Sequence, residues 1–219
     1  ALMLADHYGM SEASGVISGW IARVEVHLGN TAQAVAMLDD LPTSSETLSF
    51  RAEACILGGE WDDAVSLLDA ARDADADRSA VFPGTIRWDD GYVMLEDLVV
   101  GSGEGPRSLA LYIRALHAYA MAKSGRQAEG VQELHRLTRE TRLSVLDPYT
   151  RLYYYLYSEI LPHARTEDTE DRLTILSKSV KYMQERTSRL DEYSDKSSFI
   201  YEHLWNRRLI AEAKKHNLL

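Results

Sequence analysis

The chain has 219 residues, 45% of them hydrophobic and 26% charged, and this balance excludes a disordered chain. No apolar run approaches the roughly 18 residues that a membrane-spanning helix needs, and residues 1–6 lack the basic and apolar regions of a signal peptide. The net charge of −10 argues against a nucleic-acid partner, because phosphate binding needs a basic surface. Since the chain begins at Ala1, a cytoplasmic location and, after removal of an export signal, a bacterial periplasmic one both stay open.

Charge is distributed unevenly along the chain. Residues 1–106 carry 5 Lys and Arg against 19 Asp and Glu, a net charge of −14, whereas residues 107–219 carry 19 against 15, a net charge of +4. This division is typical either of a bipolar surface that orients a charged partner or of two ends that are solvated differently.

The first predicted unit, residues 14–42, is a pair of helices. Apolar side chains recur at helical spacing up to a stop at Gly29 and are expected to form the buried face of the first helix: Val16, Trp20, Val24 and Leu28. The partner helix begins at Thr31 and ends before Pro42, which cannot continue a helix. Its small Ala34 is expected at the point where the two helices cross.

The second unit, residues 45–76, repeats this design. Its first helix stops at Gly59, and Ala64 stands at the expected crossing. Asp62 and Asp63 fall in the first turn of the second helix, where carboxylates interact favourably with the helix dipole.

The third unit, residues 78–106, departs from the pattern. Gly91 keeps the interval, but Glu96 stands where a small residue is expected, and Pro83 interrupts the first helix. We expect an irregular segment followed by a short helix over residues 92–100.

The remaining sequence predicts regular helices again. A fourth helix pair spans residues 107–141, a further pair spans residues 148–190, and a last helix over residues 195–216 ends the array as a cap. The inward side chains expected in these last helices are Leu173, Leu176, Val180, Met183, Phe199, Leu204 and Ile210.

The turn glycines recur at nearly constant intervals. Gly29, Gly59, Gly91 and Gly125 lie 30, 32 and 34 residues apart, and a small residue follows three of them five positions later: Ala34, Ala64 and Gly130. This period, with the phrase Gly59-Glu60-Trp61-Asp62-Asp63-Ala64, resembles the tetratricopeptide repeat, here as a degenerate bacterial-type array over about residues 14–141. The resemblance implies an all-α, right-handed superhelix of antiparallel helix pairs that forms a single domain over residues 1–219.

The resemblance also implies a function. Proteins with this repeat bind a protein or peptide in a concave groove lined by the first helices of successive units. The corresponding groove positions in this chain are Arg23, His27, Glu53, Tyr112, Tyr119 and Lys123.

A cluster of tyrosines extends the predicted binding surface. Five tyrosines occur within the nine residues 149–157, and on a helix they cannot all face one buried stripe. We therefore expect Tyr154 and Tyr157 to contribute to partner binding, with Tyr154 pointing outward. Alternatively, the tyrosine hydroxyls satisfy polar groups buried between helices.

Motifs for catalysis or for a cofactor are missing from the sequence. The alternating Asp73, Asp75 and Asp77 begin like a calcium loop, but the glycine and glutamate that this loop requires are absent. Cys55 is expected to be a buried structural thiol, and the seven histidines include no pair at zinc-site spacing. We expect no enzyme activity, no metal and no cofactor. Two alternatives stay open: a helical spacer or regulatory module of a larger assembly, and a small-ligand site or enzyme in residues 78–106.

Overall fold

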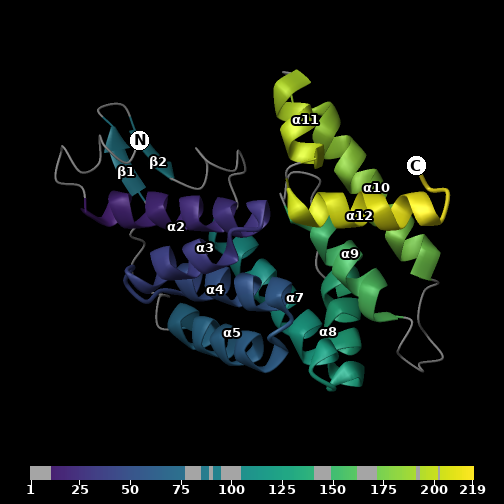
Figure 1. The fold of residues 1–219 in the computed structure, drawn as a ribbon, viewed down its shortest axis with the longest axis horizontal. Helices are drawn as coiled ribbons and strands as arrows, with labels where there is room; N and C mark the ends of the chain where they lie inside the picture. Colours follow the sequence, from purple (N-terminus) through teal and green to yellow (C-terminus); the bar gives the residue numbers. More distant parts are fainter. Residues whose placement is uncertain are drawn as a thin grey trace. The chain divides into compact units, whose positions relative to one another are not determined.

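The computed structural model describes the chain over residues 11–76, 85–88, 91–94, 105–140, 149–161, 172–190, 193–201 and 203–219. The fold is all-α, as predicted, with helices packed in neighbouring pairs and one short β-hairpin among the described residues (Figure 1). None of the helices in these ranges is both long and apolar enough to cross a membrane.

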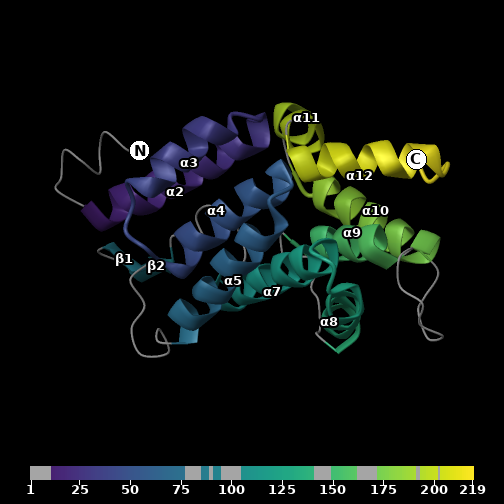
Figure 2. The same ribbon diagram turned by 60° about the horizontal axis from the view of Figure 1, so that its bottom comes forward.

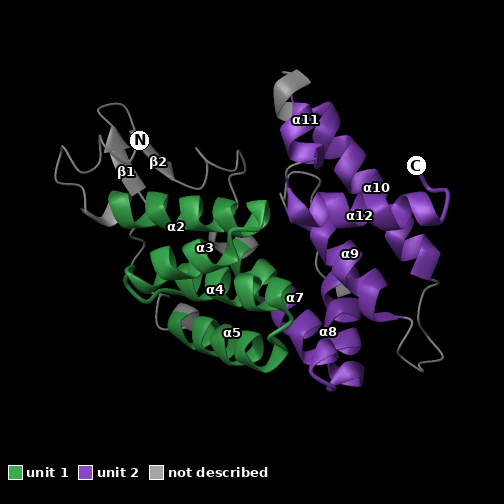
Figure 3. Cartoon of the chain, in the orientation of Figure 1, with its two compact units in different colours: residues 1–113 green, residues 114–219 purple. Residues whose placement is uncertain are grey.

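The chain divides into two compact units, Ala1–Ile113 and Arg114–Leu219 (Figure 3). The boundary falls inside helix α7 (Gly105–Lys123) and therefore inside the predicted fourth repeat. The prediction of a single domain over residues 1–219 stays a prediction.

Unit 1 contains the first two predicted helix pairs. They are α2 (Ser11–Leu28) with α3 (Thr31–Asp39), and α4 (Ser45–Gly58) with α5 (Trp61–Ala76). Helix α4 packs against α2, α3 and α5, so the two pairs lie side by side (Figure 2). The start of α4 is fixed by a capping box between Ser44 and Thr47.

The turns of these pairs have the predicted geometry. Gly29 and Gly59 adopt the left-handed conformation, with φ of +94° and +86°, which side chains rarely tolerate. Five residues later, Ala34 and Ala64 are completely buried in the helix pairs. The predicted turns in the first two units are thus confirmed, and the alanines predicted at the crossings are buried.

Replacing Ala64 by Leu should overpack the contact between α4 and α5. We expect the free energy of unfolding to fall by about 1–3 kcal/mol, measured by urea denaturation. Ala70 is an exposed alanine on the same helix, so Ala70→Leu is a matched control that should change stability by less than about 0.5 kcal/mol. Equal midpoints for the two variants would contradict the placement of Ala64 at the crossing.

The buried face of α2 differs from the predicted one. Val24 and Leu28, expected in the core, are 54% and 53% exposed, whereas Ala22 and Val26 are buried together with Arg23 and His27. The prediction was wrong because the spacing of apolar residues carries no information about Arg23, which points inward to its acidic partner Glu53.

The third unit also differs from the prediction. Strands β1 (Thr85–Trp88) and β2 (Gly91–Met94) pair antiparallel, with Ile86 opposite Val93, where an irregular segment and the start of a short helix were expected. Both strands are rich in β-branched and aromatic residues, which favour extended backbone. The remainder of the predicted helix, residues 95–100, lies outside the described residues.

Unit 2 contains the second part of α7 together with α8 (Gln127–Glu140), α9 (Thr150–Ile160) and α10 (Arg172–Ser188). The turn between α7 and α8 again has a left-handed glycine, Gly125, with φ of +101°. Helix α9 packs against both α8 and α10. It is therefore the central helix of these three.

The C-terminal segment forms two helices, α11 (Tyr193–Tyr201) and α12 (Leu204–Lys215), and not the single cap predicted over residues 195–216. The side chain of Asn206 donates to the Phe199 carbonyl oxygen at 2.6 Å, and this oxygen is the one that a continuous helix would offer to the His203 amide. Asn206 in turn accepts a hydrogen bond from Arg151 Nε at 2.7 Å. The buried face of α12 accordingly consists of Trp205, Asn206, Leu209 and Ala213.

Candidate functional site

Four of the predicted groove residues meet inside unit 1. Arg23 Nε donates to Glu53 Oε2 at 2.9 Å, and Arg23 Nη2 donates to the Tyr112 hydroxyl at 3.0 Å. His27 Nε2 lies 3.5 Å from Glu53 Oε1. All four side chains are buried, Glu53 completely. Arg23, His27, Glu53 and Tyr112, here called the buried ionic cluster, therefore join α2, α4 and α7 and do not line an open groove.

The electrostatics of the buried ionic cluster keep Glu53 ionised. Burial alone raises the pKa of Glu53, but the charge of Arg23, the charge of His27 and the hydrogen bonds outweigh this effect and lower the pKa to about 2. The Arg23 guanidinium also lies 4.8 to 5.2 Å from the ring centroids of Tyr112, Phe50 and Trp20. These contacts replace the water that both ions lose on burial.

The depressed pKa of Glu53 predicts a pH dependence of stability. Because the folded-state pKa is about 2 and the ordinary value is 4.5, the stabilisation is complete above about pH 4.5 and is lost as the pH falls toward 2. The shift corresponds to about 3 kcal/mol of unfolding free energy. Urea denaturation at several pH values should show this decline, and the double variant Arg23→Met/Glu53→Leu should show a smaller one. Identical pH profiles would contradict the assignment of the decline to Glu53.

The other two predicted groove residues belong to α7 in unit 2. Tyr119 is buried, with its ring edge-on to Trp205 at a centroid distance of 6.3 Å, and burial raises its pKa above the usual value. Lys123 is half-buried, with Nζ 5.4 Å from the Tyr119 ring centroid. Of the six predicted groove positions, Lys123 is thus the one that is not buried.

The tyrosine segment is core, which corrects the prediction for Tyr154. Tyr154 is 8% exposed, stacks on Tyr182 at a centroid distance of 5.4 Å, and donates a hydrogen bond to the Thr138 carbonyl oxygen at 3.4 Å. The hydroxyl of Tyr157 lies 2.8 Å from His135 Nδ1. Since α9 packs against helices on two sides, tyrosines that point in different directions all reach protein atoms, as the alternative interpretation expected.

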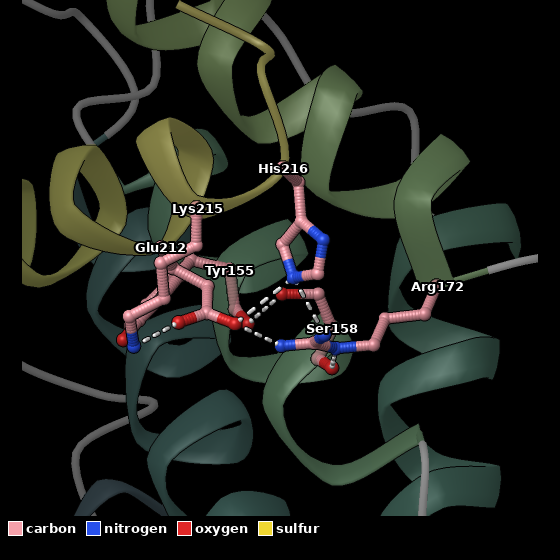
Figure 4. Close-up of polar contacts among 6 residues, drawn as sticks. All are labelled: Tyr155, Ser158, Arg172, Glu212, Lys215 and His216. Atoms are coloured by element: carbon pink, nitrogen blue, oxygen red, sulfur yellow. Dashed lines mark hydrogen bonds and ion pairs between the residues drawn. The ribbon is translucent and has the colours of Figure 1, made fainter.

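A second polar centre lies in unit 2 and is shown in Figure 4. Arg172 Nη2 donates to Glu212 Oε1 at 2.5 Å, and Arg172 Nε donates to the Ser158 carbonyl oxygen at 3.1 Å. Lys215 Nζ donates to Glu212 Oε2 at 2.9 Å. His216 Nε2 lies 3.1 Å from Arg172 Nη1 and 3.3 Å from Glu212 Oε1. We call this group the C-terminal polar centre.

The C-terminal polar centre connects three helices. Ser158 lies near the end of α9, Arg172 begins α10, and Glu212 lies in the last turns of α12. Hydrogen bonds from Lys215 and Arg172 lower the pKa of Glu212 to about 2, so the carboxylate stays charged. Sequence reasoning missed Arg172 and Glu212. The signal available was the spacing of Glu212 from Lys215 and His216, which places all three on one helix face.

In both polar centres a carboxylate is paired with cationic side chains, Glu53 with Arg23 and Glu212 with Arg172 and Lys215. Each carboxylate already accepts hydrogen bonds from its own cationic neighbours, so these groups hold helices together. In the part of the chain that the structure describes, no group of three His, Cys, Asp or Glu side chains is placed to hold a metal ion. Asp73 and Asp75 lie in helix α5, and Asp77 lies outside the described residues.

The environment of Cys55 favours the neutral thiol. The side chain is half-buried, and burial, with the nearby Glu60, raises its pKa to about 11. A thiol with this pKa is almost entirely protonated at neutral pH, and the thiolate is the nucleophilic form. The predicted full burial of Cys55 is therefore wrong, whereas its raised pKa disfavours the reactive thiolate.

Comparison with protein families defines the class of the C-terminal part. Residues 97–217 match the model of the TP_0123_C family, which is described as a C-terminal domain. The match covers more than half of the 219 residues, and the chain belongs to this family. No curated protein and no solved structure matches the chain. The matched region includes nearly all of unit 2 and the C-terminal polar centre, whereas helix pairs α2–α3 and α4–α5 precede it.

Proposed function

We propose that this chain is an α-helical repeat scaffold that binds another protein or a peptide. The observation that carries the proposal is the recurrence of one design in three helix pairs. Each pair turns at a left-handed glycine, and five residues later a small residue lies buried at the crossing. These pairs share the turn and crossing positions of the tetratricopeptide repeat, which serves mainly as a binding scaffold.

The polar interior supports a scaffold role for this repeat. The buried ionic cluster and the C-terminal polar centre each connect three helices. In both, the charged side chains form ion pairs and hydrogen bonds with other groups of the protein. Such connections hold neighbouring helices in one arrangement and thereby preserve the shape of a binding surface. The acidic N-terminal half adds a means of attracting a basic protein and disfavours a nucleic-acid partner.

Chemical crosslinking in the native organism, followed by purification of the crosslinked chain, tests this proposal. We expect a defined protein partner, and the purified partner should bind the intact chain with a saturable dissociation constant. Repeating the titration in urea above the unfolding midpoint separates binding by the folded scaffold from adsorption to unfolded chain, because only the former should disappear. Recovery of no protein that binds the purified chain would contradict the proposal.

A further inference from the structure

Helix α2 carries a second apolar face, opposite to its buried one. Ile21, Val24 and Leu28 are 37%, 54% and 53% exposed, and their spacing of three and four residues places them on one side of the helix. Ala22 and Val26 face the core of unit 1 on the other side. We call Ile21, Val24 and Leu28 the outer stripe.

The regular spacing distinguishes the outer stripe from ordinary surface residues. Single exposed apolar side chains are common on proteins and need no explanation. Three in helical register form a row into which the apolar residues of a second helix can pack, since such a helix repeats its own apolar positions at the same intervals. The geometry therefore favours a helical occupant over an extended peptide.

The net charge of the helices in unit 1 indicates the chemistry of that occupant. Residues 11–76, which form α2 to α5, contain 3 Lys and Arg against 12 Asp and Glu, a net charge of −9. The few cations are engaged: Arg23 is buried against Glu53, Arg51 lies 2.8 Å from Asp39, and Arg72 lies 3.7 Å from Asp69. An acidic surface of this kind attracts a basic partner and repels both a second copy of itself and an anionic membrane.

We infer that the outer stripe binds a basic amphipathic helix of the partner protein. This inference rests on the proposed scaffold function and names the surface and the partner class for it. The apolar face of the partner helix packs on Ile21, Val24 and Leu28, while its Lys and Arg residues are attracted by the excess of carboxylates on α2 to α5. The carboxylate of Glu25 is the nearest of these in the sequence, and it lies at the surface, where it accepts a hydrogen bond from Asn30.

Two labelled model peptides of about 18 residues, long enough for five helical turns, test the inference by fluorescence anisotropy with the intact chain. One peptide is an amphipathic helix of Leu and Lys, and the other is its Leu and Glu counterpart. We expect saturable binding of the basic peptide alone, weakening as salt is raised from about 50 to 300 mM. The variant Val24→Gln/Leu28→Gln should weaken this binding at least about tenfold without a change in melting temperature, because both side chains are exposed.

Leu173→Gln is the matched control, because Leu173, which was expected to face inward, is a 40% exposed leucine on helix α10 of unit 2. It should leave the dissociation constant of the basic peptide unchanged. Equal binding of the two peptides, or equal affinity of the wild type and Val24→Gln/Leu28→Gln, would overturn the inference. The inference would also be overturned if the wild type formed a dimer that the double variant does not form. Binding of the wild type to phosphatidylglycerol vesicles that is lost in the double variant would overturn it as well. If the partner identified by crosslinking binds the wild type and the double variant equally, the proposed scaffold function stands, but the outer stripe is not the binding site.

Discussion

Replacing Glu53 by Leu should lower the free energy of unfolding by about 3–5 kcal/mol, because the Arg23 guanidinium would remain buried without its counter-charge. The loss is large for a single substitution, since a buried ion costs several kcal/mol when its partner is removed. The Tyr112 hydroxyl and the three aromatic rings around Arg23 would stay in place but cannot neutralise the charge. Urea denaturation at neutral pH measures the effect.

A double-mutant cycle separates this charge effect from the loss of packing. Arg23→Met/Glu53→Leu removes both ions and fills their volume with apolar groups, so we expect it to recover most of the stability that Glu53→Leu loses. The coupling free energy between the two positions should therefore be large. Additive effects of the two single substitutions would show that Arg23 and Glu53 do not depend on each other.

Replacing Gly130 by Ala should also destabilise the protein, although alanine is normally the better helix former. An added Cβ would lie 2.2 Å from the Ala118 carbonyl oxygen, 2.7 Å from Ala122 Cβ and 2.9 Å from the Ala122 amide nitrogen. These are backbone atoms and a rigid methyl group, so α7 and α8 would have to move apart. We expect a loss of about 3 kcal/mol, the upper end of overpacking effects.

Gly15→Ala provides the matched control for Gly130→Ala. Gly15 also lies within a helix, α2, but nothing approaches within 4 Å of an added Cβ. The substitution should therefore raise stability by up to about 1 kcal/mol through helix propensity alone. Thermal and urea unfolding of both variants should give shifts of opposite sign. A stabilising effect of Gly130→Ala would contradict the close approach of α7 and α8.

The turns and crossings of the helix pairs could be predicted because they depend on local chemistry. A left-handed backbone favours glycine, as at Gly29, Gly59 and Gly125, and a close approach of two helices requires a small residue, as at Gly130. Both requirements are visible in the sequence without knowledge of any distant contact. The regular helix pairs of the fold were therefore predictable.

The predictions that failed concern features that depend on contacts between residues far apart in the sequence. Arg23 points inward because Glu53 and Tyr112, which lie 30 and 89 positions further along the chain, satisfy its charge. Tyr154 is buried because α9 packs between two other helices, one of them carrying Tyr182. The repeat resemblance placed Arg23 in a groove and the density of tyrosines placed Tyr154 at the surface, because neither contains information about such distant partners.

A calorimetric titration tests most directly whether the chain is a binding scaffold. The purified protein partner that crosslinking identifies is titrated into the intact chain. We predict saturable binding with a fixed stoichiometry, and weaker binding to Val24→Gln/Leu28→Gln than to the wild type or Leu173→Gln. Heats that stay at the level of dilution throughout the titration, with the chain shown by its melting curve to be folded, would contradict the proposed function.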